Sequence, residues 1–581
     1  MKHKLLNLSF MMMFSLCSCK AEAFAKSEKI KVMLERGANY FVSNPIREIF
    51  PGQDCLFEVT LLKDSKLVSV SYPDYRVVQD DKSLKLSLLN VMYPLVVTLE
   101  VSDETLSYHD IHGESSGLTD SIEIPAYRYH LRENSANGYL YFEREGYLPL
   151  CWNTKPDFSG ADIFFGSRIP SDVLSLYLKW EKETDVHDFS YEIIDDGIRI
   201  DKYHGEADQV VLPNKIMDRP VVELSGDAFS IPLQRLVIGN NMRRIKKGDA
   251  HVKVKELYLC DSLEKIGADV FSGVDRIHIN AVTKPRFSGT YYDTFPDKMD
   301  YLQERKDKKK IVFFSGSSTR YGYDLKIIKD AYPDYEVVNM GVFAYVNIKP
   351  QLDMIRTYLK EGDVLISSPE FDPNCLDCQF GTTDFFEWNE FAFVEGNYDL
   401  LSDVMVSDYP DFFSSLDKFL SNRKSMEKRN YSVTADHFDD DENYYPFLTY
   451  DEYGDFVLPR EGNETDSWIF QPLADYTLES ITPERVLSIN EVYQSLLDDG
   501  VKVLFTFSPK NRNCLNSRST KDKRREVEDY LRKNLVVPVI SSFEDDILPG
   551  TDFYKIDNHL SSKAAMERSL RMVGYLKDHL E

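Results

Sequence analysis

The chain has little positive charge for its size. It carries 69 Lys and Arg residues against 96 Asp and Glu residues, which gives a formal net charge of -27 at pH 7. Such a chain repels nucleic acid and anionic membrane surfaces, and it contains no basic cluster long enough to offset that repulsion. We therefore exclude nucleic acid as a partner.

Cysteine is also scarce, with eight residues among 581. This density is too low for a disulfide scaffold in a large chain. Cys375 and Cys378 have the spacing of a pair of metal ligands, but neither a second pair nor a histidine cluster accompanies them. We expect a local disulfide or two free thiols at these positions, and no metal site.

An apolar run at the N-terminus, residues 5–16, follows two lysines. It is too short to span a bilayer and has the form of an export signal. The run ends in Leu-Cys-Ser-Cys, which resembles the lipobox of bacterial lipoproteins. The resemblance implies a signal peptide over 1–19, with Cys19 as the lipidated first residue and several acyl chains holding the protein on the outer face of a membrane. An ordinary secretory signal with incidental cysteines is the alternative.

The rest of the chain is long enough for several domains. After a linker over 20–44, residues 45–103 form short alternating runs such as CLFEVTLL and LKLSLLNV, which predict a small β domain. Residues 104–182 resemble the internalin-type B repeat of bacterial surface proteins, on the segments GYLPLCWNT and LYLKWE. The resemblance implies a second β domain, in which Trp152 and Trp180 are expected to be core residues.

Apolar doublets recur about every twenty residues between 190 and 285. One series is Leu236 and Ile238, Leu257 and Leu259, and Ile277 and Ile279. A fixed period of this size predicts a solenoid, because each short unit must stack on its neighbour to bury its apolar stripe. The units resemble BspA-type leucine-rich repeats, which implies a binding surface or a spacer. Residues 286–304 lack a sustained apolar period and are interpreted as a linker.

From residue 305 the pattern changes to strands that alternate with helices. The runs IVFF, EVVNM, DVLIS, VKVLFTF and VVPVI predict a parallel sheet covered by helices, in the manner of a flavodoxin-like three-layer sandwich over 305–581. An insertion over 371–480, rich in acids and aromatics, is expected to form a lid or a helical subdomain. The last helix is expected to bury one face, made of Met566, Leu570, Val573, Leu576 and Leu580.

Residues suited to acyl chemistry follow the predicted strands, where sites of such sheets form. Ser318 follows the first strand, at a turn that presents a hydroxyl beside backbone N–H groups able to hold an oxyanion. His559, just before the last helix, is placed to act as general base, with Asp557 as its orienting carboxylate. The structural alternatives are a turn cap for Ser318 and an exposed loop position for His559.

This set resembles the SGNH (GDSL-like) hydrolase superfamily, and in particular its cell-envelope acyltransferase-like branch. The resemblance implies that Ser318 is the nucleophile, that the N–H groups of Ser318 and Gly341 form the oxyanion hole, and that His559 is the base. No metal or organic cofactor is required for this chemistry.

Two positions depart from the family pattern. Ile556 stands where the usual carboxylate lies, three residues before the histidine, so Asp557 takes that part. The third-block asparagine is missing, because the third strand runs into Ser-Ser-Pro and then Glu370. Loss of one oxyanion donor typically lowers the rate by roughly a hundred- to a thousandfold. An acid would oppose an oxyanion, so we expect Glu370 to cap a turn or a helix.

The sequence therefore predicts an exported, lipid-anchored surface protein. Its C-terminal domain is expected to be a serine esterase or O-acyltransferase that acts on acyl groups of carbohydrate or cell-envelope polymer. The repeats add a host or surface protein as a further partner. The alternative is a non-catalytic binding or adhesion protein whose SGNH-like fold has lost catalysis.

Overall fold

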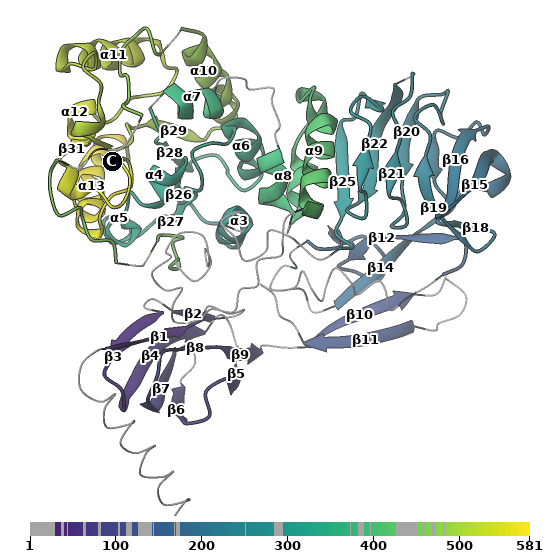
Figure 1. Cartoon of the computed structure of the whole chain (residues 1–581), viewed down its shortest axis with the longest axis horizontal. Helices are drawn as coiled ribbons and strands as arrows, with labels where there is room; N and C mark the ends of the chain where they lie inside the picture. Colours follow the sequence, from purple (N-terminus) through teal and green to yellow (C-terminus); the bar gives the residue numbers. More distant parts are fainter. Residues whose placement is uncertain are drawn as a thin grey trace, which may run out of the picture. The chain divides into compact units, whose positions relative to one another are not determined.

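Figure 1 shows the structure, a computed structural model, in which two compact units are distinguished. Most of the first unit lies in Met1–Thr105, and the second holds Leu106–Ile124, Leu131–Arg429 and Tyr450–Glu581. Among the residues described, no helix combines the length and hydropathy needed to cross a membrane. The residues described are 29–35, 40–42, 45–61, 66–79, 83–102, 105–111, 119–125, 142, 144–167, 169, 173, 175–249, 251–283, 294–371, 373–380, 388–395, 397–425, 450–456, 459–467, 469, 472–481 and 483–580.

The first unit is a β domain whose strands form three sheets, ordered β3-β1-β8, β2-β4-β7-β6 and β5-β9. In β4 exposed and buried residues alternate, and its inner face buries Cys55, Phe57, Val59 and Leu61. The strands are β1 (Ile30–Leu34), β2 (Tyr40–Val42), β3 (Ile46–Ile49), β4 (Gln53–Leu61), β5 (Lys66–Val70), β6 (Tyr75–Gln79), β7 (Ser83–Val91), β8 (Leu95–Val97) and β9 (Leu99–Ser102). Strands β1 and β2 lie before the start expected for this domain.

The next sheet has the order β11-β10-β14-β12-β13. Its strands are β10 (Thr105–Ile111), β11 (Thr119–Pro125), β12 (Tyr147–Asn153), β13 (Asp162–Ile163) and β14 (Ser175–Lys182). Trp152 is buried, with the rings of Phe142 and Phe165 edge-on at 6.1 Å. Its expected packing role is confirmed. Trp180 is only half-buried, and its indole N–H donates to Asp110 at 2.8 Å.

Residues 189–280 form two sheets of mostly parallel strands, ordered β15-β16-β19-β21-β23 and β17-β20-β22-β24, with β18 and β25 paired to β19 and β22. The apolar series of the sequence is stacked in register, since Leu236 lies opposite Leu257 and Leu257 opposite Ile277. A short helix, η2 (Val186–Asp188), precedes the strands β15 (Phe189–Ile194), β16 (Gly197–Tyr203), β17 (Gln209–Val211), β18 (Lys215–Ile216), β19 (Arg219–Leu224), β20 (Leu233–Val237), β21 (Arg244–Ile245), β22 (Val252–Cys260), β23 (Lys265–Ile266), β24 (Phe271–Ser272) and β25 (Arg276–Asn280).

The C-terminal part is an α/β domain around one parallel sheet of order β27-β26-β28-β29. Its strands are β26 (Lys310–Phe314), β27 (Glu336–Asn339), β28 (Val364–Ser367) and β29 (Lys502–Phe505). The fifth predicted strand is reduced to a single parallel bridge between Phe505 and Val539. The coarse expectation of a multidomain chain that mixes β-sheets with an α/β region is therefore confirmed.

Helices cover both faces of this sheet. Successive strand residues point to opposite sides, so the residues of one strand pack against helices on both faces. Ile311 and Phe313 of β26 belong to the cluster that includes α5 and α13, whereas Val312 and Phe314 belong to the cluster that includes α3, α6 and α10. The elements of the domain outside the sheet are α3 (Thr294–Glu304), α4 (Ser317–Arg320), α5 (Leu325–Ala331), α6 (Ile348–Arg356), α10 (Pro483–Asp498), β30 (Lys510–Asn511), η8 (Arg512–Cys514), α11 (Lys521–Asn534), α12 (Phe543–Asp546), β31 (Ile547–Leu548), η9 (Gly550–Asp552) and α13 (Ser562–Leu580). Helix α3 lies in the segment interpreted as a linker.

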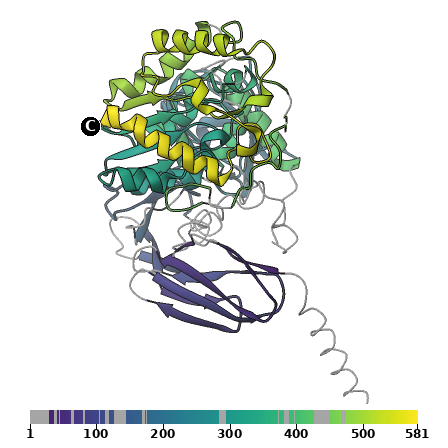
Figure 2. The ribbon, with the colours of Figure 1, turned by 90° about the vertical axis from the view of Figure 1, so that its left-hand side faces the viewer.

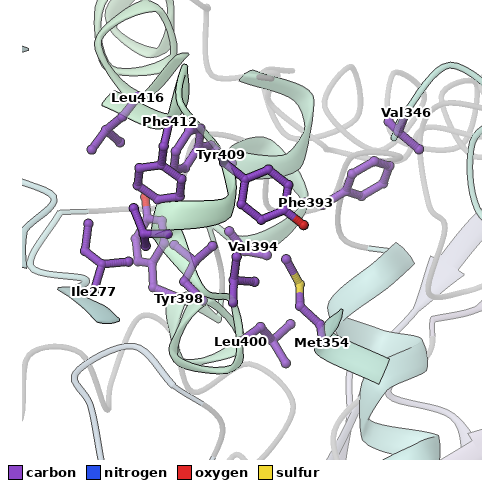
Figure 3. Packing of buried hydrophobic residues seen from close by; sticks show 14 of the residues in the cluster. Ile277, Val346, Met354, Phe393, Val394, Tyr398, Leu400, Tyr409, Phe412 and Leu416 are labelled. Carbon is purple, nitrogen blue, oxygen red and sulfur yellow. The ribbon is translucent and has the colours of Figure 1, made fainter. Parts of the chain in front are cut away.

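The described part of the insertion joins the repeats to the α/β domain. It contains α7 (Pro373–Phe380), α8 (Trp388–Val394), η4 (Tyr398–Asp403), η5 (Val406–Asp408) and α9 (Phe412–Ser425). Figure 3 shows side chains of α8, η4 and α9 packed between Ile277 of β25 and Met354 of α6. Polar contacts fix the same junction: Asp417 accepts from the Ile266 N–H at 2.9 Å, and Arg423 pairs with Asp261 at 3.3 Å.

The buried face of α13 differs from the expected one. Figure 2 shows α13, in yellow, across one face of the α/β domain. Met566 and Leu570 are 42% and 58% exposed, whereas Arg568 and Ser569 are buried. The prediction of the buried helix face from the apolar period was wrong, because two of the buried positions carry polar side chains. These side chains contact the strand-end loops described below.

Candidate functional site

The loops that follow β26, β27 and β28 meet at one edge of the sheet, since the strands are parallel. Ser318 lies on α4 directly after β26, and Gly341 lies just past β27. The loops touch closely: a Cβ on Gly341 would lie 2.3 Å from the Arg320 backbone nitrogen. Only glycine fits there. The structure thus brings together the residues that were assigned to the first two blocks of the site.

Ser318 is fully buried, with 0% of its surface exposed. Its Oγ has no hydrogen-bond partner in the part of the chain that the structure describes. Its backbone N–H donates to Oε1 of Glu370 at 2.8 Å. The first predicted oxyanion donor therefore already has a carboxylate acceptor.

Glu370 reaches this turn from the loop after β28, and it is 1% exposed. Its Oε2 accepts from the Gln379 carboxamide at 2.6 Å and from the Ser315 hydroxyl at 3.3 Å. A Cβ on Gly316 would lie 2.6 Å from both carboxylate oxygens, so glycine at that position lets the carboxylate approach. The capping role expected for Glu370 is confirmed, and the turn it caps is the one that carries Ser318.

Gly341 has a similar internal partner. Its N–H donates to the Asn339 side-chain oxygen at 2.9 Å, and its carbonyl accepts from the Lys298 ammonium at 2.7 Å. Both backbone donors of the predicted oxyanion hole are thus bonded within the protein. Neither points to a free acceptor position.

His559 lies at the same edge as Ser318. The His559 ring is buried and packs on the ring of Tyr321, with centroids 4.1 Å apart and planes at 37°. Tyr321 directly follows α4, three residues after Ser318. Because Ser318 Oγ bonds to no described group, a Ser318–His559 hydrogen bond is not formed.

Asp557 has a partner other than the histidine it was expected to orient. Its carboxylate forms a buried ion pair with Lys510, and it has no further side-chain bond among the residues that the structure describes. Its backbone carbonyl accepts from the Asn511 N–H at 2.8 Å. The serine, histidine and aspartate therefore share a region of the fold without forming a hydrogen-bonded chain.

A buried lysine that the sequence analysis missed supports the second loop. Lys298 of α3 is fully buried, and its ammonium lies 4.8 Å from the Tyr450 ring centroid. Burial, reinforced by nearby Arg320, lowers the pKa of Lys298 well below its usual value. Phe295, Met299 and Leu302 are spaced at a helical period, which is the signal that could have revealed this helix.

Asp455, from the far end of the insertion, completes this loop. It accepts from the Asn339 carboxamide at 2.7 Å and from the Leu325 N–H. Burial raises the pKa of Asp455 to about 6. Close by, Arg460 donates to the Leu560 and Phe456 carbonyls at 2.8 Å, and burial lowers its pKa to about 10. These groups hold the loops around Ser318 and His559.

Arg568 of α13 is a further residue that the sequence analysis missed. Its Nη2 donates to the Ser368 hydroxyl at 2.9 Å and to the Phe507 carbonyl at 2.7 Å. Its guanidinium lies 4.3 Å from the Tyr323 ring centroid, and a Cβ on Gly322 would lie 2.6 Å from Nη1. No apolar periodicity signals a buried arginine, so only the structure identifies it.

Buried polar atoms without a hydrogen-bond partner gather around this edge. Within the described ranges they include Ser318 Oγ, Thr319 Oγ1, Asn558 Oδ1 and Arg568 Nη1. Folded proteins leave few such atoms, and a local group of them indicates a functional site or ordered water. The edge thus keeps the polarity of a site although its oxyanion donors are bonded internally.

The remaining site expectations concern metals, cysteines and the N-terminus. In the described ranges no cluster of three or more His, Cys, Asp and Glu side chains is arranged to hold a metal ion. Cys375 and Cys378 lie on α7 as thiols. Cys19 lies outside the residues that the structure describes, so its lipidation stays a prediction.

Comparison with known proteins gives little further information. No protein-family model matches the chain, and no curated protein matches it. Among solved structures, the crystal structure of a leucine-rich repeat protein from T. pallidum is 21% identical over 16% of this chain and 71% of its own length, with a TM-score of 0.12. That likeness is too weak to support a shared fold.

Proposed function

We propose that this chain is an exported, lipid-anchored surface protein that acts by binding, and that its C-terminal domain is a catalytically silent SGNH-like domain of flavodoxin-like architecture. The strand order β27-β26-β28-β29 and the helices on both faces support the architecture. The meeting of Ser318, Gly341 and His559 at one edge supports the SGNH resemblance. Both predicted oxyanion donors are bonded within the protein, which supports catalytic silence.

The observation that carries this proposal is the hydrogen bond from the Ser318 N–H to the Glu370 carboxylate. An acyl transfer would place an oxyanion at that N–H, next to an existing negative charge. Two unit charges 4 Å apart repel by about 4 kcal/mol at an effective dielectric constant of about 20. This corresponds to about a thousandfold in rate, in addition to the cost of the missing third-block asparagine.

An open groove on the repeat strands supports a binding role. It has a volume of about 470 Å³ and is lined by residues of β17, β20, β22 and β25, together with Asp275 just before β25. Gln209, Arg235, Glu256 and Arg276 lie opposite one another in adjacent strands, and Tyr258 lies beside this row. Polar side chains next to an aromatic ring suit the hydroxyl groups of a carbohydrate or cell-envelope polymer, and leucine-rich repeats would present such a row.

Binding to purified cell-envelope polysaccharide fragments by the full-length chain tests this role. We expect the substitution Arg276→Ala to weaken binding at least fivefold, because Arg276 lines the groove. Lys521→Ala, on the exposed α11, is the matched control and should leave binding unchanged. Equal affinities for the wild type, the groove variant and the control would contradict the proposed groove.

A second candidate function is the esterase or O-acyltransferase, favoured by the buried Ser318 Oγ that lacks a partner beside the Tyr321–His559 pair. In that case Ser318 would attack the acyl carbon and His559 would take its proton. Incubation of the wild-type chain with an aryl acetate and a fluorophosphonate probe distinguishes the two functions. We expect no turnover and no labelling; rapid labelling at Ser318 would favour the enzyme.

A further inference from the structure

Glu370 is a buried carboxylate without a cationic partner in the described chain. Its three partners are neutral donors: the Ser318 N–H at 2.8 Å, the Gln379 carboxamide at 2.6 Å and the Ser315 hydroxyl at 3.3 Å. A buried charge is costly unless it is paired, so most buried acids lie beside a cation or a metal ion. A charge held by neutral groups alone calls for a functional explanation.

The position of the Glu370 carboxylate is fitted to the turn. Oxyanion-hole donors lie 2.7–3.1 Å from the oxygen that they stabilise, and the distance from the Ser318 N–H to Glu370 Oε1 is 2.8 Å. Gly316 makes the approach possible, since a Cβ there would lie 2.6 Å from both carboxylate oxygens and 2.7 Å from Ala344 Cα. The carboxylate oxygen thus takes the place that the oxygen of a reacting carbonyl would need.

We propose that Glu370 is an internal oxyanion mimic that masks a serine acyl-transfer activity at Ser318. The activity is latent, and the negative charge of Glu370 keeps it so. Two side chains that the reaction needs lie at this edge, since Ser318 Oγ has no hydrogen-bond partner among the described residues and the His559 ring packs on Tyr321. The reaction requires these two side chains to come into hydrogen-bond contact. This inference goes beyond the proposed binding function, since it assigns to the same domain a reaction that removal of one charge releases.

The released reaction needs no reagent other than the ester and water. With an aryl acetate, Ser318 Oγ forms a bond to the carbonyl carbon while the bond from that carbon to the aryl oxygen breaks. The hydroxyl proton passes to the His559 ring and from there to the departing aryloxide. Water then attacks the acetylated serine by the reverse path, which releases acetate and restores the Ser318 hydroxyl.

The substitution Glu370→Gln tests the inference in the full-length chain. Glutamine has the same shape and removes the charge. Its neutral oxygen accepts the Ser318 N–H bond more weakly than a carboxylate does, so an incoming carbonyl oxygen can displace it. Removal of a repulsion of about 4 kcal/mol predicts up to about a thousandfold faster reaction. We expect fluorophosphonate labelling and aryl acetate turnover at least tenfold above the wild type, with the labelled peptide identified by mass spectrometry as the one that contains Ser318.

Three further variants make the result specific. Glu370→Ala empties the position and should also be labelled, which guards against a folding defect that is peculiar to the glutamine variant. The double variant Ser318→Ala with Glu370→Gln should lose both labelling and turnover. Glu464→Gln, on an exposed loop, makes the same charge change elsewhere and should behave like the wild type.

Two outcomes would overturn the inference, and they differ in what they leave standing. If the Glu370→Gln and Glu370→Ala variants keep the wild-type circular dichroism and Tm yet react no faster, Glu370 masks nothing and the silent binding domain stands. If the wild type is labelled at Ser318 as fast as the glutamine variant, both the mask and the catalytic silence are wrong.

Discussion

The repeat region and the strand-end edge of the α/β domain place their polar residues in opposite ways. In the repeats, Arg235 and Arg276 line an open groove, whereas Leu236, Leu257 and Ile277 stack inside. At the strand-end edge, Ser318, Glu370 and the neighbouring Lys298 are buried. A stacked repeat requires only an apolar interior and a solvent-exposed polar face. The strand-end edge requires particular polar side chains to contact one another in the buried interior.

The junction between these two regions combines apolar packing with a buried ion pair. Apolar side chains of the insertion cover the end of the repeats (Figure 3). Within that contact Arg423 reaches the buried Asp261, which also accepts from Val282 and Thr283. The described part of the insertion therefore connects the two regions. The comparison between the repeat region and the strand-end edge can be tested at this junction as well as within each region.

Removal of the junction cation should have the largest effect. Arg423→Met leaves the Asp261 carboxylate buried without its ion pair, and loss of one partner of a buried pair costs about 3–5 kcal/mol. Urea unfolding followed by tryptophan fluorescence measures the change. Arg243→Met, which removes an exposed partner of Glu264, is the matched control and should cost less than about 1 kcal/mol. Equal losses would show that the junction is not a buried contact.

A methyl group at the Ser318 turn should have the next largest effect. Gly316→Ala forces a Cβ within 2.6 Å of both Glu370 carboxylate oxygens, and such overpacking costs about 1–3 kcal/mol. Gly574→Ala on α13, where a Cβ meets no atom within 4 Å, is the control and should not destabilise the chain. Thermal unfolding of both variants gives the comparison, and a neutral Gly316→Ala would contradict the close carboxylate position.

The junction should also depend on pH through Asp399 of η4. Burial, with Asp403 and Asp162 nearby, raises the pKa of Asp399 from 3.8 to about 7. A raised folded-state pKa means that the folded chain binds the extra proton, so the contribution to stability is complete below about pH 4 and is lost as the pH rises to about 7.

We therefore expect Asp399→Asn to gain about 3 kcal/mol relative to the wild type between pH 4 and pH 7. Asp522→Asn on the exposed α11 supplies the control, for which the difference from the wild type should not change with pH. Urea unfolding at several pH values measures both. A constant difference for Asp399→Asn would mean that its carboxyl titrates normally.

The smallest effect is expected on α13. Leu570 is 58% exposed, so Leu570→Ala should change the free energy of unfolding by less than about 0.5 kcal/mol. Met572→Ala, two residues away and buried, should cost about 2–4 kcal/mol. A reversed order of the two losses would restore the helix face that the sequence period suggested.

The outcome for individual residues shows where sequence reasoning works. The in-register stacking of the apolar repeat series follows from its fixed period, because stacking buries identical positions together. The strands β26 to β29 follow from apolar runs between helical segments. Lys298 and Arg568 were missed because a buried cation interrupts an apolar pattern. Each cation is stabilised by hydrogen bonds to a carbonyl or hydroxyl group that follows another strand, and the order of residues does not reveal those bonds.

The sequence by itself determined the alternation of strands and helices, the repeat period and the residue types that gather where the parallel strands end. These depend on periodicity along the chain, which is a local property. Only the tertiary structure decided that the Glu370 carboxylate, rather than an open oxyanion position, faces the Ser318 N–H, and that Asp557 pairs with Lys510. The bonds of a buried polar group depend on what the fold brings within about 3 Å, and residue order does not contain that distance.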